Sequence, residues 1–78
     1  MIRTAKDFGN LIQTTRKKQK ITQVELAAAS GVGQRFIREL EKGKPSCQLE
    51  KTLLVATMLG IKFQAILPTL IKAKSNRS

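Results

Sequence analysis

Apolar residues recur at helical spacing in four successive stretches of the chain, and residues typical of helix ends separate the stretches. Thr4 and Asp7, three residues apart, have the form of an N-terminal cap. Phe8 and Ile12 then lie one turn apart, and the pattern predicts a first helix that runs through about Lys18.

The second and third stretches are short and lie close together. Thr22 and Glu25 have the spacing of a capping box, which opens a second helix, and Gly31 stops that helix only nine residues later. The apolar rhythm then restarts and predicts a third helix from about Gly33 to Lys42. The two short helices therefore meet at a tight turn.

The fourth stretch predicts a helix from about Gln48, after the breakers Gly43 and Pro45, with Gly60 as its C-terminal stop. We expect it to bury five apolar side chains, namely those of Leu49, Leu53, Val55, Ala56 and Leu59.

The segment 61–67 changes period, because its apolar residues alternate as they do in a strand: Ile61, Phe63, Ala65 and Leu67. A lone strand cannot satisfy its backbone hydrogen bonds, and the chain has no second strand pattern. We therefore expect two copies of the chain to pair these strands antiparallel in a homodimer. The alternative is a fifth helix over the same residues.

A chain of 78 residues with a formal net charge of +10 is a single small domain that attracts polyanions. We assign residues 1–67 to this domain and residues 68–78 to a basic, flexible tail. Nucleic acid is therefore the leading class of partner. A cationic membrane peptide would need one long helix, which Gly31, Gly43, Pro45 and Gly60 interrupt. RNA binding is disfavoured because the phenylalanines lie at expected core positions.

The composition argues against catalysis, because the chain has no His and no Tyr and its five carboxylates are scattered. The single Cys47 has no partner for a zinc site or for a disulfide within the chain, so no metal and no cofactor is expected. A signal-peptide core and a membrane-spanning run are also absent from the sequence, which predicts a cytoplasmic location.

Residues 23–42 have the form of a helix-turn-helix. Ala27 is small where two helices must approach closely, and Gly31 makes the turn. Three apolar residues, Val32, Ile37 and Leu40, anchor the second of these helices from beneath. Its outer side then presents polar side chains to a DNA groove, from Gln34, Arg35 and Arg38.

These motifs resemble the Cro/repressor (XRE) superfamily of bacterial and phage regulators over roughly residues 5 to 60. The phrases Ile-Thr-Gln-Val-Glu-Leu-Ala at 21–27 and Phe-Ile-Arg-Glu-Leu-Glu-Lys-Gly-Lys-Pro at 36–45 carry the resemblance, particularly to the HipB-type antitoxin branch. It implies an all-α fold, in which a four-helix repressor-like domain is followed by a C-terminal dimerising β-strand. It also implies a repressor that binds an inverted-repeat operator, represses its own operon and neutralises a HipA-like serine/threonine kinase toxin. The alternative is a free-standing repressor of phage or prophage type with no toxin partner.

The resemblance also implies roles for individual residues. The first turn of the recognition helix would meet base edges through Gly33, Gln34 and Arg35, with Arg38 one turn later. Thr22 and Gln23 would meet a phosphate at the start of the second helix, although the Gln23 position in the family also supports the recognition helix. Gly33 departs from the family, which more often has Ser or Thr there.

Position along the chain adds three phosphate contacts that flank the groove-reading unit, Arg16, Lys42 and Lys44. Glu39 lies four residues after Arg35, so we expect an ion pair within the helix that orients the arginine.

Overall fold

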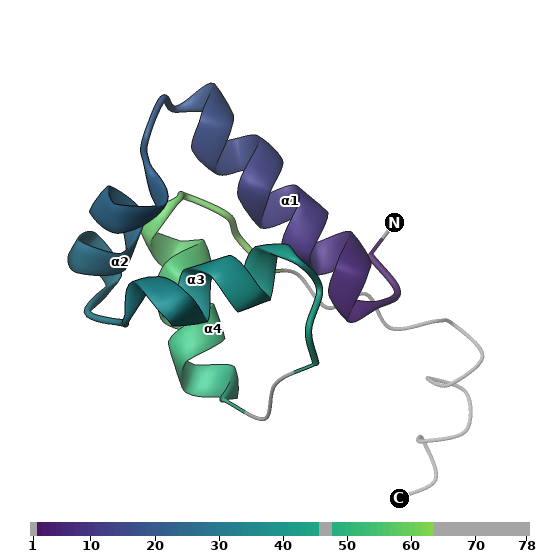
Figure 1. Ribbon diagram of the computed structural model, residues 1–78. Coiled ribbons are helices and arrows are strands. Elements are labelled where there is room, and N and C mark those ends of the chain that lie inside the picture. The colour runs from purple at the N-terminus through teal and green to yellow at the C-terminus, as the bar shows by residue number, and fades with distance from the viewer. Residues whose placement is uncertain (1, 46–47, 64–78) are drawn as a thin grey trace, which may run out of the picture.

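The computed structural model describes residues 2–45 and 48–63, and within them four helices enclose an apolar core (Figure 1). The helices are α1 (Ala5–Lys18), α2 (Gln23–Ser30), α3 (Gln34–Glu41) and α4 (Leu49–Met58). α3 packs against both α1 and α2, and α4 packs against α2. None of these four helices has the length and apolar character that a membrane crossing requires.

The predicted starts of the first two helices are confirmed. The Thr4 hydroxyl accepts a hydrogen bond from the Asp7 amide at 3.0 Å. At the start of α2, Thr22 Oγ1 accepts from the Glu25 amide at 3.0 Å, and Glu25 Oε1 accepts from the Thr22 amide at 2.8 Å. Both halves of the capping box are therefore present, and they satisfy backbone donors that have no partner within a helix.

The turn between α2 and α3 depends on Gly31, whose φ of +73° is a left-handed conformation that a side chain disfavours. The turn is closed by the Val32 amide, which donates to the carbonyl of Ala27. α1 ends in a similar turn, in which Lys20 has the positive φ of 58° and the Ile21 amide donates to the carbonyl of Arg16. Gly31 therefore ends α2 as the sequence predicts.

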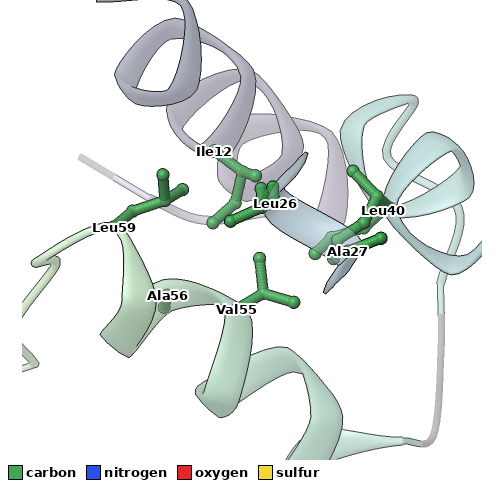
Figure 2. Close-up of a cluster of buried hydrophobic side chains, with 8 residues drawn as sticks. Ile12, Leu26, Ala27, Leu40, Val55, Ala56 and Leu59 are labelled. Carbon is green, nitrogen blue, oxygen red and sulfur yellow. The ribbon is translucent and has the colours of Figure 1, made fainter. Parts of the chain in front are cut away.

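The core lies between the four helices, and Figure 2 shows most of its side chains converging from α1, α2, α3 and α4. Its buried members are Ile12, Leu26, Ala27, Ile37, Leu40, Val55, Ala56 and Leu59. Val32 is partly buried and packs against this cluster. The predicted anchors of the recognition helix, Val32, Ile37 and Leu40, thus face inward as expected.

α1 and α3 approach closely at Gly9. A Cβ atom built there would collide with the carbonyl oxygen of Leu40 and lie 2.9 Å from that of Glu41. On the other side of the same junction, a Cβ on Gly43 would collide with the backbone of Lys6. Two glycines therefore allow the last turn of α3 to lie directly on α1.

The expectation that α4 buries all five of its predicted apolar residues is wrong for Leu49 and Leu53, which are 66% and 39% exposed. Both lie in the first half of α4, which in Figure 1 extends beyond α2 and α3. In the second half of the helix Val55 and Ala56 are buried, whereas Leu54 and Met58 are 48% and 49% exposed. Helical periodicity shows which residues of α4 are apolar, but it does not show which of them a neighbouring helix covers.

The predicted strand over 61–67 is only partly within the described residues. Residues 61–63 form no strand; Ile61 packs against the core, and the Phe63 ring stacks on Phe8 with centroids 6.2 Å apart. Ala65, Leu67 and the predicted tail 68–78 lie outside the described residues, as does Cys47. Pairing of this segment across a dimer stays a prediction.

Candidate nucleic-acid interface

α3 divides into a buried face and an exposed face, as a recognition helix must. Ile37 and Leu40 are buried, whereas Gln34, Arg35 and Arg38 are exposed. The Arg35 side chain is 82% exposed. Because residues three and four apart share a helix face, these polar groups form one outward surface that is backed by the core.

The first turn of α3 has no side-chain cap. Gly33 is the N-cap residue and is exposed, and no side-chain atom accepts a hydrogen bond from the amides of this turn. This is the consequence of glycine at a position where the family more often has a hydroxyl. Gly33 can therefore contribute to an interface only through its backbone.

The predicted ion pair between Arg35 and Glu39 is present, and it has a second cation. Arg35 Nε donates to Glu39 Oε2 at 3.2 Å, and Lys44 Nζ lies 3.3 Å from the same oxygen. The Lys44 hydrogen bond is the largest influence that lowers the pKa of the Glu39 carboxyl below its usual value, and Arg35 adds to it. Glu39 therefore carries its charge throughout the neutral range.

A second network is buried where α1, α2 and α3 meet. Arg16 Nε donates to Glu41 Oε2 at 2.5 Å, and its Nη2 donates to Glu41 Oε1 at 3.1 Å. Arg16 Nη1 donates to the Ile21 carbonyl at 2.8 Å, and Gln23 Nε2 donates to Glu41 Oε1 at 3.0 Å. The Arg16 and Glu41 side chains are 9% and 2% exposed. This network fixes the end of α3 to α1 and to the start of α2.

The sequence patterns did not predict this network, and Arg16 was expected to contact a phosphate instead. The signal was available, because Arg16 lies one turn after buried Ile12, and Glu41 lies one turn after buried Ile37. Opposite charges on two buried helix faces indicate a pair, since an unpaired charge is too costly to bury. With its donors directed to Glu41 and the Ile21 carbonyl and its side chain 9% exposed, Arg16 presents little surface to a phosphate.

The remaining predicted phosphate contacts lie at the ends of the helix-turn-helix. Lys42 and Lys44 are exposed after α3. Thr22 is exposed at the start of α2, but its hydroxyl is engaged in the capping box. Gln23 is partly buried, and its amide supports the end of α3 through Glu41. Of the two roles expected for Gln23, support of the recognition helix is the one visible in the structure.

Other kinds of site find no support in the described ranges 2–45 and 48–63. No group of three or more His, Cys, Asp or Glu side chains there is arranged to hold a metal ion. The feature that stands out is the outward face of α3, which carries two arginines and a glutamine above a buried apolar underside. Side chains of these types recognise base edges in the major groove.

The chain is similar to several known regulators. A family model described as helix-turn-helix matches residues 12–66. An uncharacterized HTH-type transcriptional regulator, y4mF, of Sinorhizobium fredii is 45% identical over 67 residues, which cover 86% of this chain and 88% of that protein. The immunity repressor protein of Bacillus phage phi105 is 35% identical over 66 residues, but the match covers 82% of this chain and only 46% of the repressor.

A solved structure agrees with these relatives. The restriction-modification controller protein C.AhdI from Aeromonas hydrophila superposes with a TM-score of 0.67 at 28% sequence identity, over 74% of this chain and 84% of that one. The fold, the family model and the two relatives point to the same class. The chain belongs to the helix-turn-helix family of DNA-binding transcriptional regulators, of the Cro/repressor type.

Proposed function

We propose that the protein is a transcriptional repressor that binds an inverted-repeat sequence in double-stranded DNA as a homodimer. The observation that carries the proposal is the exposed polar face of α3, opposite its buried anchors. α3 of each copy enters a major groove. Gln34, Arg35 and Arg38 meet base edges there, and Gly33 contributes its backbone at the N-terminus of the helix.

Phosphate contacts on both sides of α3 hold the helix in the groove. Lys42 and Lys44 follow α3 and are exposed, so they supply charge on one side. On the other side, the start of α2 presents the Gln23 amide and the positive end of the helix dipole, next to Thr22, whose own amide is engaged by Glu25. These contacts give affinity and register, whereas the side chains of α3 give sequence preference.

Two observations support a second copy as the partner of α4. The helix leaves four large apolar side chains exposed in the single chain, those of Leu49, Leu53, Leu54 and Met58. The segment predicted to pair across the dimer, 61–67, follows this helix directly. To bind an inverted repeat, such a dimer must hold its two recognition helices about one helical turn of DNA, roughly 34 Å, apart.

Repression follows if the operator overlaps a promoter, because the bound dimer excludes other proteins from it. The similarity to a phage immunity repressor supports this direction of regulation. The further prediction of a HipA-like kinase partner rests on the family resemblance alone. Affinity purification of the chain from its native cell tests it, and recovery of a protein with kinase sequence motifs is the expected result.

The test of DNA recognition is selection from a library of randomised duplexes, followed by Kd measurements across a range of salt concentrations. We expect one inverted-repeat sequence to be enriched. Gln34→Ala and Arg35→Ala relax the base preference and leave the salt dependence almost unchanged. Lys42→Ala and Lys44→Ala weaken binding to every duplex and reduce the salt slope by about one.

A matched control is Lys18→Ala, which removes the same charge from an exposed position on α1 outside the helix-turn-helix. We expect it to leave both the base preference and the salt slope at the operator close to those of the wild type, unlike the α3 variants and the Lys42 and Lys44 variants respectively. Enrichment of no sequence at moderate ionic strength would contradict the proposal. Sedimentation measures the dimer, and Leu53→Asp on the exposed part of α4 is expected to shift it toward the monomer.

A further inference from the structure

Two cations share one oxygen atom at the end of α3. Glu39 Oε2 accepts a hydrogen bond from Arg35 Nε at 3.2 Å and from Lys44 Nζ at 3.3 Å. Arg35 is one of the proposed base readers, and Lys44 is one of the proposed phosphate contacts. The two kinds of DNA contact therefore meet at a single carboxylate.

The backbone places Lys44 at this carboxylate. Gly43 has a φ of +83°, and the Lys44 amide donates to the carbonyl oxygen of Glu39 at 3.1 Å. This left-handed turn folds the chain back over the last turn of α3. The Lys44 side chain is nevertheless 61% exposed, so a phosphate group of DNA can compete with Glu39 for it.

The geometry of Arg35 restricts how it can meet a base. Its Nε is used by Glu39, and neither Nη group has a partner among the described residues. A guanidinium held at Nε presents its two Nη groups side by side as a fork. Such a fork matches the two acceptors O6 and N7 that guanine shows in the major groove.

We propose that Glu39 is a specificity-determining residue, which holds Arg35 at Nε so that its Nη groups read a guanine. Once a DNA phosphate has drawn Lys44 away, Arg35 is the cation that remains bonded to Glu39 Oε2. This inference rests on the proposed function of α3 as a recognition helix. Glu39 positions the arginine in this arrangement and need not touch the DNA. Its negative charge also repels phosphates, so it disfavours duplexes in which Arg35 finds no guanine.

The first step of the test identifies the guanine that Arg35 reads. In the duplex selected by the wild-type chain, each guanine is replaced in turn by 7-deazaguanine, which lacks the N7 acceptor and keeps its base pairing. The guanine of interest is the one whose replacement weakens the wild-type chain and leaves Arg35→Ala unaffected. We expect the loss in the wild type to be about tenfold.

The second step measures the same guanine discrimination in Glu39→Ala, as the ratio of the Kd for the 7-deazaguanine duplex to the Kd for the guanine duplex. We expect the ratio to fall to less than about threefold, while affinity for an unrelated duplex rises severalfold because a negative charge has been removed. These opposite changes separate positioning from a general structural role, because a damaged fold weakens both. Glu50→Ala is the control, since it removes an exposed carboxylate from α4 and should leave the ratio unchanged.

A third measurement tests the exchange of Lys44. If a phosphate draws Lys44 from Glu39, Lys44→Met reduces the salt slope by about one and retains the guanine discrimination. An unchanged slope would show that Lys44 stays on Glu39 in the complex and would overturn this part. An unchanged ratio in Glu39→Ala would overturn the role of Glu39, whereas failure to select any duplex would instead contradict the proposed function itself.

Discussion

Glu39 and Glu41 lie two residues apart on α3, and the helix gives them opposite surroundings. The Glu41 side chain is 2% exposed and receives hydrogen bonds from Arg16 and Gln23. The Glu39 side chain is 35% exposed and shares one oxygen between Arg35 and Lys44. A rotation of about 200° around the helix axis separates the two positions, enough to move a carboxylate from the core to the surface. The buried pair therefore supports the fold, whereas the exposed pair lies on the face that we propose for DNA recognition.

The largest effect is expected from removal of the buried partner. Glu41→Ala leaves Arg16 charged and without its partner inside the protein, and we expect the free energy of unfolding to fall by about 3–5 kcal/mol. Urea unfolding followed by circular dichroism measures it.

The exposed carboxylate of Glu39 provides the control for that measurement. Glu39→Ala removes the same group from the exposed pair, and we expect the free energy of unfolding in urea to stay close to that of the wild type, since exposed ion pairs contribute little. Equal destabilisation by Glu39→Ala and Glu41→Ala would refute the distinction between the two pairs.

The close packing around the buried pair predicts the next effect. Gly9→Ala adds a Cβ that collides with the last turn of α3, so we expect a loss of about 1–3 kcal/mol in the free energy of unfolding. Helix propensity alone predicts a gain of about 0.5–1 kcal/mol for the same change, so the sign decides between the two. Asn10→Ala, at the exposed neighbouring position, serves as the control in the same urea titration.

A double substitution tests whether apolar side chains can replace the buried ion pair. Arg16→Met combined with Glu41→Leu removes both charges, and apolar replacement of a buried pair often costs little. The Ile21 carbonyl and the Gln23 amide lose their partners in this variant. We therefore expect a net loss of about 1–2 kcal/mol, smaller than that of Glu41→Ala. A double variant less stable than Glu41→Ala would show that Arg16 stabilises the fold even without Glu41, through its hydrogen bond to the Ile21 carbonyl, and would contradict the cost assigned to its unpaired charge.

The smallest effect concerns titration of the exposed pair. Lys44→Met removes the largest influence that lowers the pKa of Glu39, so we expect that pKa to rise toward 4.5. Because the folded pKa is depressed, the stabilisation from this pair is present above the ordinary value and is lost as pH falls through the folded pKa. Carbon-13 NMR of the Glu39 carboxyl measures the shift. Arg35→Ala should produce a smaller rise, and a larger one would reverse the assigned order of the two cations.

Local signals predicted much of the fold. The Thr22 and Glu25 capping box, the turn at Gly31 and the inward anchors of α3 all follow from short-range backbone chemistry, and each is confirmed. The exposed positions of Gln34 and Arg35 follow from the same helical spacing.

The features that the sequence reading missed depend on contacts between distant elements. Gly9 matters only because the last turn of α3 lies against it, 31 or more residues further along the chain. Arg16 was read as a surface cation because the basic run at residues 16–20 suits a helix end, which hid the burial of its first member. Leu49 was expected in the core because periodicity does not show where a neighbouring helix stops.

Gly33, the N-cap residue of α3, can be replaced by a residue with a side chain without a steric clash. A Cβ added there would meet no atom within 4 Å. Serine or threonine could therefore occupy the position without any repacking, and each would bring a cap for α3 and a hydroxyl at the edge of the groove. If α3 enters the groove as proposed, one exchange at this position would change the groups offered to the DNA, while the interior that supports the helix stays as it is.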